Sequence, residues 1–389
     1  MSNHEMNRRS ALHAIAATSI GAASGLVGPR LLASQEGSRQ AGVSTRGGPL
    51  PLEMAGYRYD RVQALIDGRV AVENADVVFE VSSIGEMNTH ILSGPQTRAV
   101  TEIGLSPYML AFANEGFRDY SLIPVFPLRV FRHRSIFIRT DRGIETPEDL
   151  RGKRVATPGY SSTSLTWIRG IMQHEYGVNP EDVTWVISSK DSSADLSGGP
   201  SKQENVLPTG LTIDTGPEGK DESDLLADGD VDALFHAAEP RAYLEGNPLV
   251  ARLFADYRST ERAYYAETGI FPIMHAVAMR NDVIDANPWL PEAVFDAYSA
   301  AKQLAYQRLR KKAWFEDSVP WIGQEVEETR GLMGDNYWPY GIAPNREALE
   351  TLFRYLHEQG LASRQLRVEE VFHPSTLEFE EDPGIDPAR

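Results

Sequence analysis

Residues 144–178 read IETPEDLRGKRVATPGYSSTSLTWIRGIMQHEYGV, and this stretch decides the fold class. It predicts a short helix with Pro147 at its first position, then the strand Lys153–Thr157, and then a helix over Leu165–Tyr176. A further strand, Val183–Ile187, comes next. Strands that alternate with helices in this way are typical of an α/β fold.

The same alternation continues on both sides of this stretch and divides the chain into two lobes. We expect the first lobe to comprise residues 50–139 plus 270–377, and the second lobe to comprise residues 140–262. The chain would cross between the lobes twice, near residues 137–140 and 264–273. A ligand would bind in the crevice between the lobes, where strand ends and helix amino termini meet.

Three other segments have a recognisable character. Val130–Ile138 predicts a long extended segment. Residues 188–219 are rich in Ser, Gly and Pro without a clear period, which predicts a long loop or insertion. Residues 378–389 form an acidic tail with Pro and Gly, which we expect to fray.

The composition excludes several classes of protein. The chain has 389 residues in ordinary globular proportions and a net charge of -17; residues 1–48 carry five Arg and two Glu, so the remainder stands at -20. A surface of this sign repels phosphate backbones and anionic headgroups, so we expect no nucleic-acid partner and no peripheral membrane binding. There is no Cys, which excludes disulfides, iron–sulfur clusters, Cys–zinc sites and thiol nucleophiles.

The first 33 residues have the layout of a twin-arginine (Tat) export signal. The pair Arg8-Arg9 precedes a weakly apolar stretch, residues 10–28, that is too polar for a comfortable membrane span. We expect cleavage after Ala33, a polar linker over residues 34–50, and export to the periplasm or the cell exterior. The alternative is a leader in which the arginine pair occurs by chance, and the protein would then be cytoplasmic.

Arginine side chains are the first candidates for a binding site, because guanidinium groups hold carboxylates with paired hydrogen bonds. Arg132, His133 and Arg134 form the sharpest cluster. On a regular strand Arg132 and Arg134 would share one face, and His133 would take the other. Arg61, with Tyr59 two residues before it, lies at an expected strand-to-helix junction, where such folds place ligand contacts. The structural alternatives are a strand-edge arginine paired with protein carboxylates and a solvated Arg61.

Two further residues join His133 as candidates for acid–base chemistry. Glu102 lies inside the otherwise apolar strand Ala99–Gly104, so its carboxylate must be paired or must have a raised pKa. It could serve as the general acid, or it could form a buried ion pair with Arg132. His275 lies near the return crossing, and it is either catalytic or a core histidine bonded to the backbone.

Hydroxyl groups at two expected helix starts are candidates for holding a carboxylate, together with the free backbone N–H groups there. The helix within the opening stretch begins with Tyr160, Ser161, Ser162 and Thr163. Ser106 precedes Pro107 at the other helix start. The alternative is that these hydroxyl groups only cap their own helices.

Common cofactor and catalytic motifs are missing from the sequence. It contains no G-x-G-x-x-G, Walker loop or G-x-S-x-G motif, so nucleotide cofactors and serine hydrolysis are not expected. No H-x-H or H-E-x-x-H spacing is present either. A divalent metal could still be held by His133, His275, Glu102 or Asp60 if the fold brings them together.

Several long stretches resemble the 4,5-dihydroxyphthalate decarboxylase family. They include PVFPLRVFRHR (124–134), WIRGIMQHEYGV (167–178), TGIFPIMH (268–275) and EVEETRGLMG (325–334), and with shorter ones they span most of residues 57–377. The segment PEDLRGKRV (147–155) is similar to the entry into the second lobe of type 2 periplasmic binding proteins.

The resemblance implies the two-lobed fold of type 2 periplasmic binding proteins and the conversion of 4,5-dihydroxyphthalate to 3,4-dihydroxybenzoate and carbon dioxide. Such a reaction needs a general acid that protonates the ring, and a para hydroxyl supplies electron density, so no cofactor is strictly required. The alternative is an exported solute-binding protein that delivers an anionic small molecule to an ABC-type transporter permease. Either function requires a crevice that binds an aromatic or other small carboxylate.

Overall fold

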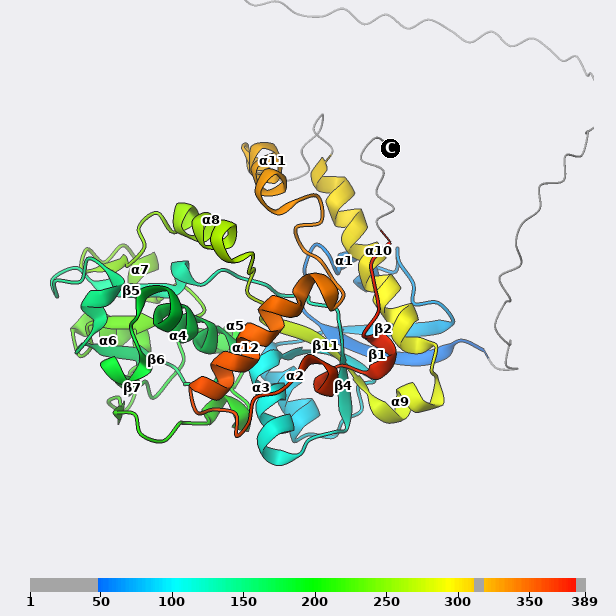
Figure 1. The fold of residues 1–389 in the computed structure, drawn as a ribbon, viewed down its shortest axis with the longest axis horizontal. Helices are drawn as coiled ribbons and strands as arrows, with labels where there is room; N and C mark the ends of the chain where they lie inside the picture. Colours follow the sequence, from blue (N-terminus) through cyan, green and yellow to red (C-terminus); the bar gives the residue numbers. More distant parts are fainter. Residues whose placement is uncertain (1–47, 311–317, 383–389) are drawn as a thin grey trace, which may run out of the picture. The chain divides into compact units, whose positions relative to one another are not determined.

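Two mixed β-sheets form the framework of the computed structural model, which describes residues 48–310 and 318–382 (Figure 1). The described residues belong to one compact unit. The predicted export signal lies outside the described residues, as do residues 34–47 of the predicted linker and residues 383–389 of the predicted acidic tail. No helix in the described ranges is both long and apolar enough to cross a bilayer.

The first sheet has the strand order β2-β1-β3-β11-β4. Its strands are β1 Leu50–Gly56, β2 Ala75–Val81, β3 Val100–Gly104, β4 Tyr120–Ile123 and β11 His275–Arg280. Strand β11 runs antiparallel to β3, and His275 pairs with Gly104 in the register. Paired residues point to the same face, and so do residues two apart on one strand, so the side chains of His275 and Glu102 lie on one face.

The second sheet has the strand order β10-β5-β9-β6-β7-β8. Its strands are β5 Ile136–Arg139, β6 Arg154–Thr157, β7 Thr184–Ile187, β8 Ile213–Thr215, β9 Ala233–Phe235 and β10 Val250–Arg252. Strands β6, β7, β8 and β9 pair in parallel, whereas β5 is antiparallel to both β9 and β10. This mixture of parallel strands and covering helices confirms the α/β class.

The predicted boundary of the first lobe at residue 139 is wrong. Strand β5 pairs with β9 and β10 through Ile136–Arg139, so it belongs to the second sheet. The first crossing therefore lies between Ile123 and Ile136, earlier than residues 137–140. The return passes from β10 through helix α8, Tyr257–Thr268, to β11.

Helices cover both sheets and connect their strands (Figure 1). Besides α8 they are α1 Gln63–Ile66, α2 Ile84–Leu92, α3 Leu105–Leu110, α4 Thr163–Tyr176, α5 Ala194–Ser197, α6 Glu222–Asp228, α7 Arg241–Leu244, α9 Asn281–Ala286, α10 Leu290–Arg310, α11 Ile322–Met333, α12 Arg346–Glu358 and α13 Val368–Val371. The π-helical turn is η1 Ala111–Glu115, and the 3-10 turns are η2 His133–Ser135, η3 Pro147–Leu150, η4 Pro180–Asp182, η5 Lys202–Asn205, η6 Ala343–Asn345 and η7 Pro374–Thr376.

Two segments differ from their predicted local structure. Val130–Ile138 is not one extended segment, because the turn η2 interrupts it and the backbone of Arg132 is close to helical, with φ -118° and ψ 0°. The predicted loop over residues 188–219 contains α5, η5 and β8. Strand β8 adds to the second sheet by pairing with β7, which gives this stretch an order that its Ser, Gly and Pro content does not predict.

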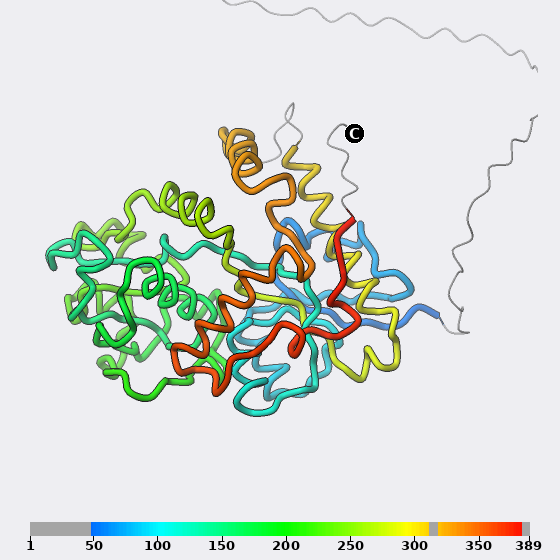
Figure 2. The backbone as a smooth tube through the Cα atoms, viewed as in Figure 1, coloured from blue at the N-terminus to red at the C-terminus, as the bar shows by residue number. Residues whose placement is uncertain are grey.

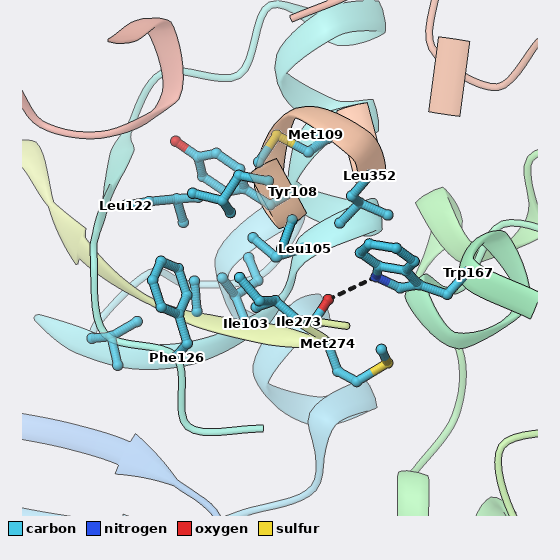
Figure 3. Packing of buried hydrophobic residues seen from close by; sticks show 14 of the residues in the cluster. Ile103, Leu105, Tyr108, Met109, Leu122, Phe126, Trp167, Ile273, Met274 and Leu352 are labelled. Atoms are coloured by element: carbon cyan, nitrogen blue, oxygen red, sulfur yellow. Dashed lines mark hydrogen bonds between the residues drawn. The ribbon is translucent and has the colours of Figure 1, made fainter. Parts of the chain in front are cut away.

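One hydrophobic core runs from the first sheet into the helices of the second lobe, and Figure 3 shows its central part. There the indole Nε1 of Trp167, on α4, donates a hydrogen bond of 3.0 Å to the carbonyl oxygen of Ile273, next to β11. Helix α12 packs against α4 from the other side. The carboxyl-terminal segment returns to the first sheet (Figure 2). There Phe372 bridges to Leu122 of β4. These contacts fix the amino terminus of α4 relative to β11.

Candidate active site

A cavity of about 410 Å³ lies between the two sheets, in the place predicted for the ligand. One wall comes from the first sheet and its connections, and includes Tyr57, Tyr59 and His275. The other wall comes from the second lobe and includes Arg132 and the start of helix α4. The volume lies in the range of small-molecule sites, and apolar side chains occupy much of the lining between a few polar groups.

His275 and Glu102 form a buried pair at the first wall. Nδ1 of His275 lies 2.6 Å from Oε1 of Glu102, which also accepts a hydrogen bond of 2.9 Å from the hydroxyl of Tyr59. The backbone N–H of Tyr57 donates to Oε2 of Glu102 at 3.0 Å. Because an ionised carboxylate only accepts, these contacts assign a proton to Nδ1 of His275. Its Nε2 has no hydrogen-bond partner among the described residues, and the ring lines the cavity.

Arg132 is a buried cation at the second wall. Its side chain donates to the carbonyl oxygen of Ala237 at 3.2 Å and to Oγ of Ser164 at 2.5 Å, while its Nε has no partner in the described ranges. No carboxylate lies within 4.0 Å of this guanidinium in the part of the chain that the structure describes. Burial, and then repulsion from Arg134, lower the pKa of Arg132 to about 9, so it remains charged at neutral pH. Glu261 acts against this lowering of the pKa without making a direct ion pair, so the guanidinium has room for a bound anion in direct contact.

The amino terminus of α4 lies in the same wall as Arg132. Ser162 is the N-cap, and Ser162, Thr163 and Ser164 line the cavity. The first N–H groups of a helix have no intrahelical acceptor, and the helix dipole makes this end positive. The wall therefore combines a guanidinium, a hydroxyl and a helix amino terminus, a set of groups that suits a carboxylate.

Arg134 lines the cavity, but a protein carboxylate already pairs with it. Glu239 accepts hydrogen bonds of 2.8 Å from both Arg134 and Arg252, and all three residues line the cavity. The group formed by Arg132, Arg134, Arg252 and Glu239 therefore carries a net positive charge. Arg252 is missing from the predicted site because nothing in the local sequence of the short strand β10 marks it.

His133 is not in the cavity, which overturns the prediction that it is a catalytic acid. The turn η2 directs its ring into an aromatic environment, 5.2 Å from the ring centres of Phe254 and Tyr264. Burial lowers the pKa of His133 to about 4, so the ring is neutral at physiological pH. Neither ring nitrogen has a hydrogen-bond partner among the described residues.

Four other predicted ligand contacts do not line the cavity. Arg61 stacks on Trp338 at 3.9 Å and donates to the carbonyl oxygen of Pro127. The backbone N–H of Ser106 donates to Thr163, and Ser106 is not an N-cap because α3 already begins at Leu105. The remaining two are Tyr160, buried beneath Arg169, and Ser161, whose Oγ donates to the carbonyl oxygen of Gln203 at 2.7 Å.

The ion pair proposed between Glu102 and Arg132 does not exist, because Glu102 pairs with His275. The predicted set of metal ligands is not assembled either. In the described ranges, the group of metal-ligand side chains that does converge is Asp191, Glu222 and His236, and it contains none of the four predicted residues. His236 follows directly after strand β9, and its place at a strand end is a signal that could have identified it.

Comparisons with known proteins identify the family of this chain. The chain is 35% identical over 332 residues to a 4,5-dihydroxyphthalate decarboxylase of Comamonas testosteroni, covering 85% of this chain and 98% of that protein. It is 33% identical over 216 residues to a 4,5-dihydroxyphthalate decarboxylase of Pseudomonas putida, covering 56% of this chain and 81% of that protein. Residues 129–199 match the model of the NMT1/THI5 like family.

Among solved structures, a putative periplasmic sulfonate-binding protein, SsuA of Methylobacillus flagellatus KT, covers 85% of this chain and 93% of its own, with a TM-score of 0.51 and 13% identity. That likeness confirms the fold of periplasmic binding proteins. The identity to the Comamonas protein over nearly its whole length establishes more: the chain belongs to the 4,5-dihydroxyphthalate decarboxylase family.

Proposed function

We propose that this protein removes one carboxylate from 4,5-dihydroxyphthalate and yields 3,4-dihydroxybenzoate and carbon dioxide. Its curated relatives of the same family carry that activity in their names. The proposal rests on the presence, in one cavity, of the buried Arg132, which has no carboxylate in direct contact, and of the His275–Glu102 pair. Arg132 suits the binding of an anionic substrate, and the His275–Glu102 pair suits proton transfer.

Substrate binding would use the second wall of the cavity. At neutral pH the substrate is a dianion, and one of its carboxylates would take the place of the missing counterion of Arg132. Ser164 and the first N–H groups of α4 would donate to the same carboxylate. We assign this position to the carboxylate that is retained, because an arginine contact would oppose the loss of charge as carbon dioxide leaves.

The proton would come from Nε2 of His275, on the opposite wall. In the imidazolium form, this nitrogen would protonate the ring carbon that bears the leaving carboxylate, and a hydroxyl para to that carbon would supply electron density. The bond between the ring and the carboxylate then breaks, carbon dioxide departs, and the electron pair restores the aromatic ring. Glu102 would orient the imidazole and balance its charge through Nδ1.

These steps balance in protons and electrons without an oxidant or a reductant. Because the chain itself supplies the anion site and the acid, the proposal requires no cofactor.

The direct experiment is to incubate the full chain with 4,5-dihydroxyphthalate, with and without a divalent metal, and to follow 3,4-dihydroxybenzoate and carbon dioxide. His275→Gln should lower kcat by about 10²- to 10⁴-fold, the usual contribution of a general acid, and should spare substrate binding. His174→Ala is the matched control, because His174 forms a similar pair with Glu358 at 2.7 Å but lies outside the cavity. That variant should keep full activity.

Two results would count against the proposal. Tight, saturable binding of 4,5-dihydroxyphthalate without any product would favour the alternative, a solute-binding protein that delivers its ligand to a transporter permease. Unchanged turnover in His275→Gln would remove the assigned acid even if the activity itself were present.

A further inference from the structure

Three side chains of metal-ligand type converge beside the cavity. Asp191 comes from the segment after β7, Glu222 from the first turn of α6, and His236 from the residue after β9. One ligand atom from each lies within 4.8 Å of those of the other two. Asp191 and His236 line the cavity, and Glu222 lies behind them and is fully buried.

The imidazole of His236 faces both carboxylates: its Nε2 contacts Asp191 and, at 3.2 Å, Oγ of Ser193, whereas its Nδ1 has no partner. Only 2% of His236 is exposed. Its Nε2 lies 3.3 Å from Oδ1 of Asp191, and its Nδ1 lies 3.7 Å from Oε1 of Glu222. That Nδ1 has no hydrogen-bond partner in the described part of the chain. A buried ring nitrogen is thus directed at a buried carboxylate without making a hydrogen bond to it.

The charge of the cluster is also not balanced by the protein. No Lys or Arg of the described residues forms an ion pair with Asp191 or Glu222, so two carboxylates share one imidazole. Buried charges in proteins are paired or they coordinate metals. A cation among the three side chains would supply both the missing positive charge and a partner for the ring nitrogen.

We propose that Asp191, Glu222 and His236 bind a divalent cation of the first transition series, such as Zn²⁺ or Mn²⁺, in the wall of the cavity. One imidazole nitrogen and two carboxylates are a donor set for these ions, whereas Mg²⁺ and Ca²⁺ prefer oxygen ligands alone. Three protein ligands leave at least one coordination position open. Because two of the ligands line the cavity, that open position would face its occupant.

The residues around Glu222 fit a supporting role. Its Oε2 accepts from the hydroxyl of Ser188 at 3.2 Å, and its Oε1 accepts from the backbone N–H of Ser192 at 3.2 Å. Such bonds orient a coordinating carboxylate.

The test is calorimetric titration of Zn²⁺ into the full chain after removal of bound metal with a chelator, in the absence of any substrate. The unaltered chain should bind one Zn²⁺ at this site. His236→Ala and Asp191→Asn should each weaken that binding by more than the roughly 10- to 100-fold that loss of a supporting residue costs. His174→Ala removes a histidine paired with Glu358 away from the cluster, and it should bind Zn²⁺ like the unaltered chain.

Asp191→Asn is the variant that should keep the fold, because the Asp191 side chain is partly exposed and the amide has the same shape as the carboxylate. Thermal unfolding provides a second readout: Zn²⁺ should raise the Tm of the unaltered chain and of His174→Ala, but not that of the two cluster variants. Absence of saturable Zn²⁺ binding, or equal binding by all four proteins, would overturn the proposal. Neither readout depends on decarboxylation, so the cation site and the proposed function can fail separately.

Discussion

Replacing Arg132 by Met would remove a buried charge while keeping most of the side-chain volume. The guanidinium donates to three neutral acceptors, Ser135, Ser164 and Ala237, and its Nε is still free to donate to a carboxylate. Hydrogen bonds to charged groups contribute about 1.5–3 kcal/mol each. Two such bonds, partly replaced by the N–H groups of α4, predict a loss of about 2–4 kcal/mol, or roughly 30- to 1,000-fold in affinity.

The assay compares two ligands that report charge and ring separately. Phthalate carries both carboxylates but lacks the hydroxyl groups that promote decarboxylation, and catechol carries the hydroxyl groups without the charge. Calorimetry should show that Arg132→Met weakens phthalate binding by the predicted factor and changes catechol binding little. Arg169→Met is the matched control, because Arg169 is also buried but lies outside the cavity. An equal loss for both ligands in Arg132→Met would refute the charge-pairing role.

The same substitution has a predicted effect on stability. A structural arginine stabilises the fold, so its loss lowers the Tm. Arg132 is instead a buried cation with no carboxylate in direct contact, and its replacement by an apolar side chain removes the cost of burying that charge. We therefore expect the ligand-free Arg132→Met chain to keep or raise its Tm. A clear decrease would indicate that Arg132 serves the fold more than the ligand.

Three further predictions concern the acid, the core and the aromatic site of His133. Glu102→Gln keeps the shape of the side chain but removes the charge beside His275. Turnover should therefore fall, while the affinity for phthalate should stay within about twofold. Unchanged turnover would contradict the role of the His275–Glu102 pair. Gly170→Ala would push a methyl group into the ring of Tyr355 and should lower the free energy of unfolding, measured with urea, by about 1–3 kcal/mol. In the control Gly331→Ala, on α11, the new methyl group meets open space and should not destabilise the chain. Equal changes in the two variants would contradict the close contact between Gly170 and Tyr355. Burial lowers the pKa of His133 from 6.5 to about 4. Below pH 6.5 the unfolded chain therefore takes up a proton that the folded chain does not. The contribution of this ring to the free energy of unfolding is complete above pH 6.5 and is lost as the pH falls through 4, by up to roughly 3 kcal/mol. His133→Phe should therefore lose less stability than the unaltered chain between pH 7 and pH 4, and an identical loss would show that this ring does not titrate as described.

The sequence predicts the regular parts of the molecule well because their signals are local. The strand Lys153–Thr157 and the helix Leu165–Tyr176 are found with small shifts, as β6 and α4. The crevice follows from the order of these elements, since strand ends and helix starts meet there. Glu102 could also be identified, because a carboxylate in an apolar strand demands a partner, and His275 provides it.

The errors arise where tertiary contacts decide the local structure. Strand periodicity places Arg132 and Arg134 on one face and His133 on the other, and both arginines do line the cavity, but the turn η2 replaces the expected strand and turns His133 into an aromatic environment. That turn is held by distant groups, because the backbone N–H of Arg134 donates to Glu261 at 3.1 Å. No pattern within the segment contains this information.

The cluster of Asp191, Glu222 and His236 likewise could not be predicted from the sequence. The three residues lie 31 and 14 positions apart, so no short spacing links them as it links a metal motif. Their proximity follows from the parallel order β9-β6-β7 in the second sheet, which brings residues after β7 and β9 to one edge. Strand order depends on pairing across the whole lobe, so such a site can be found only once the sheet is known.

The two walls of the cavity divide the work that the proposed reaction needs. The second lobe provides an unpaired guanidinium and a helix amino terminus, which are sufficient for binding an anion and would serve a transport protein equally well. The first lobe provides His275 and Glu102, fixed by the antiparallel register of β11 and β3. A protein that only binds its ligand has no need of an imidazole whose one nitrogen is held by a buried carboxylate while the other faces the cavity. The difference between a binding protein and a decarboxylase on this fold would then rest on the first wall, and exchanging His275 alone should leave a protein that still binds phthalate.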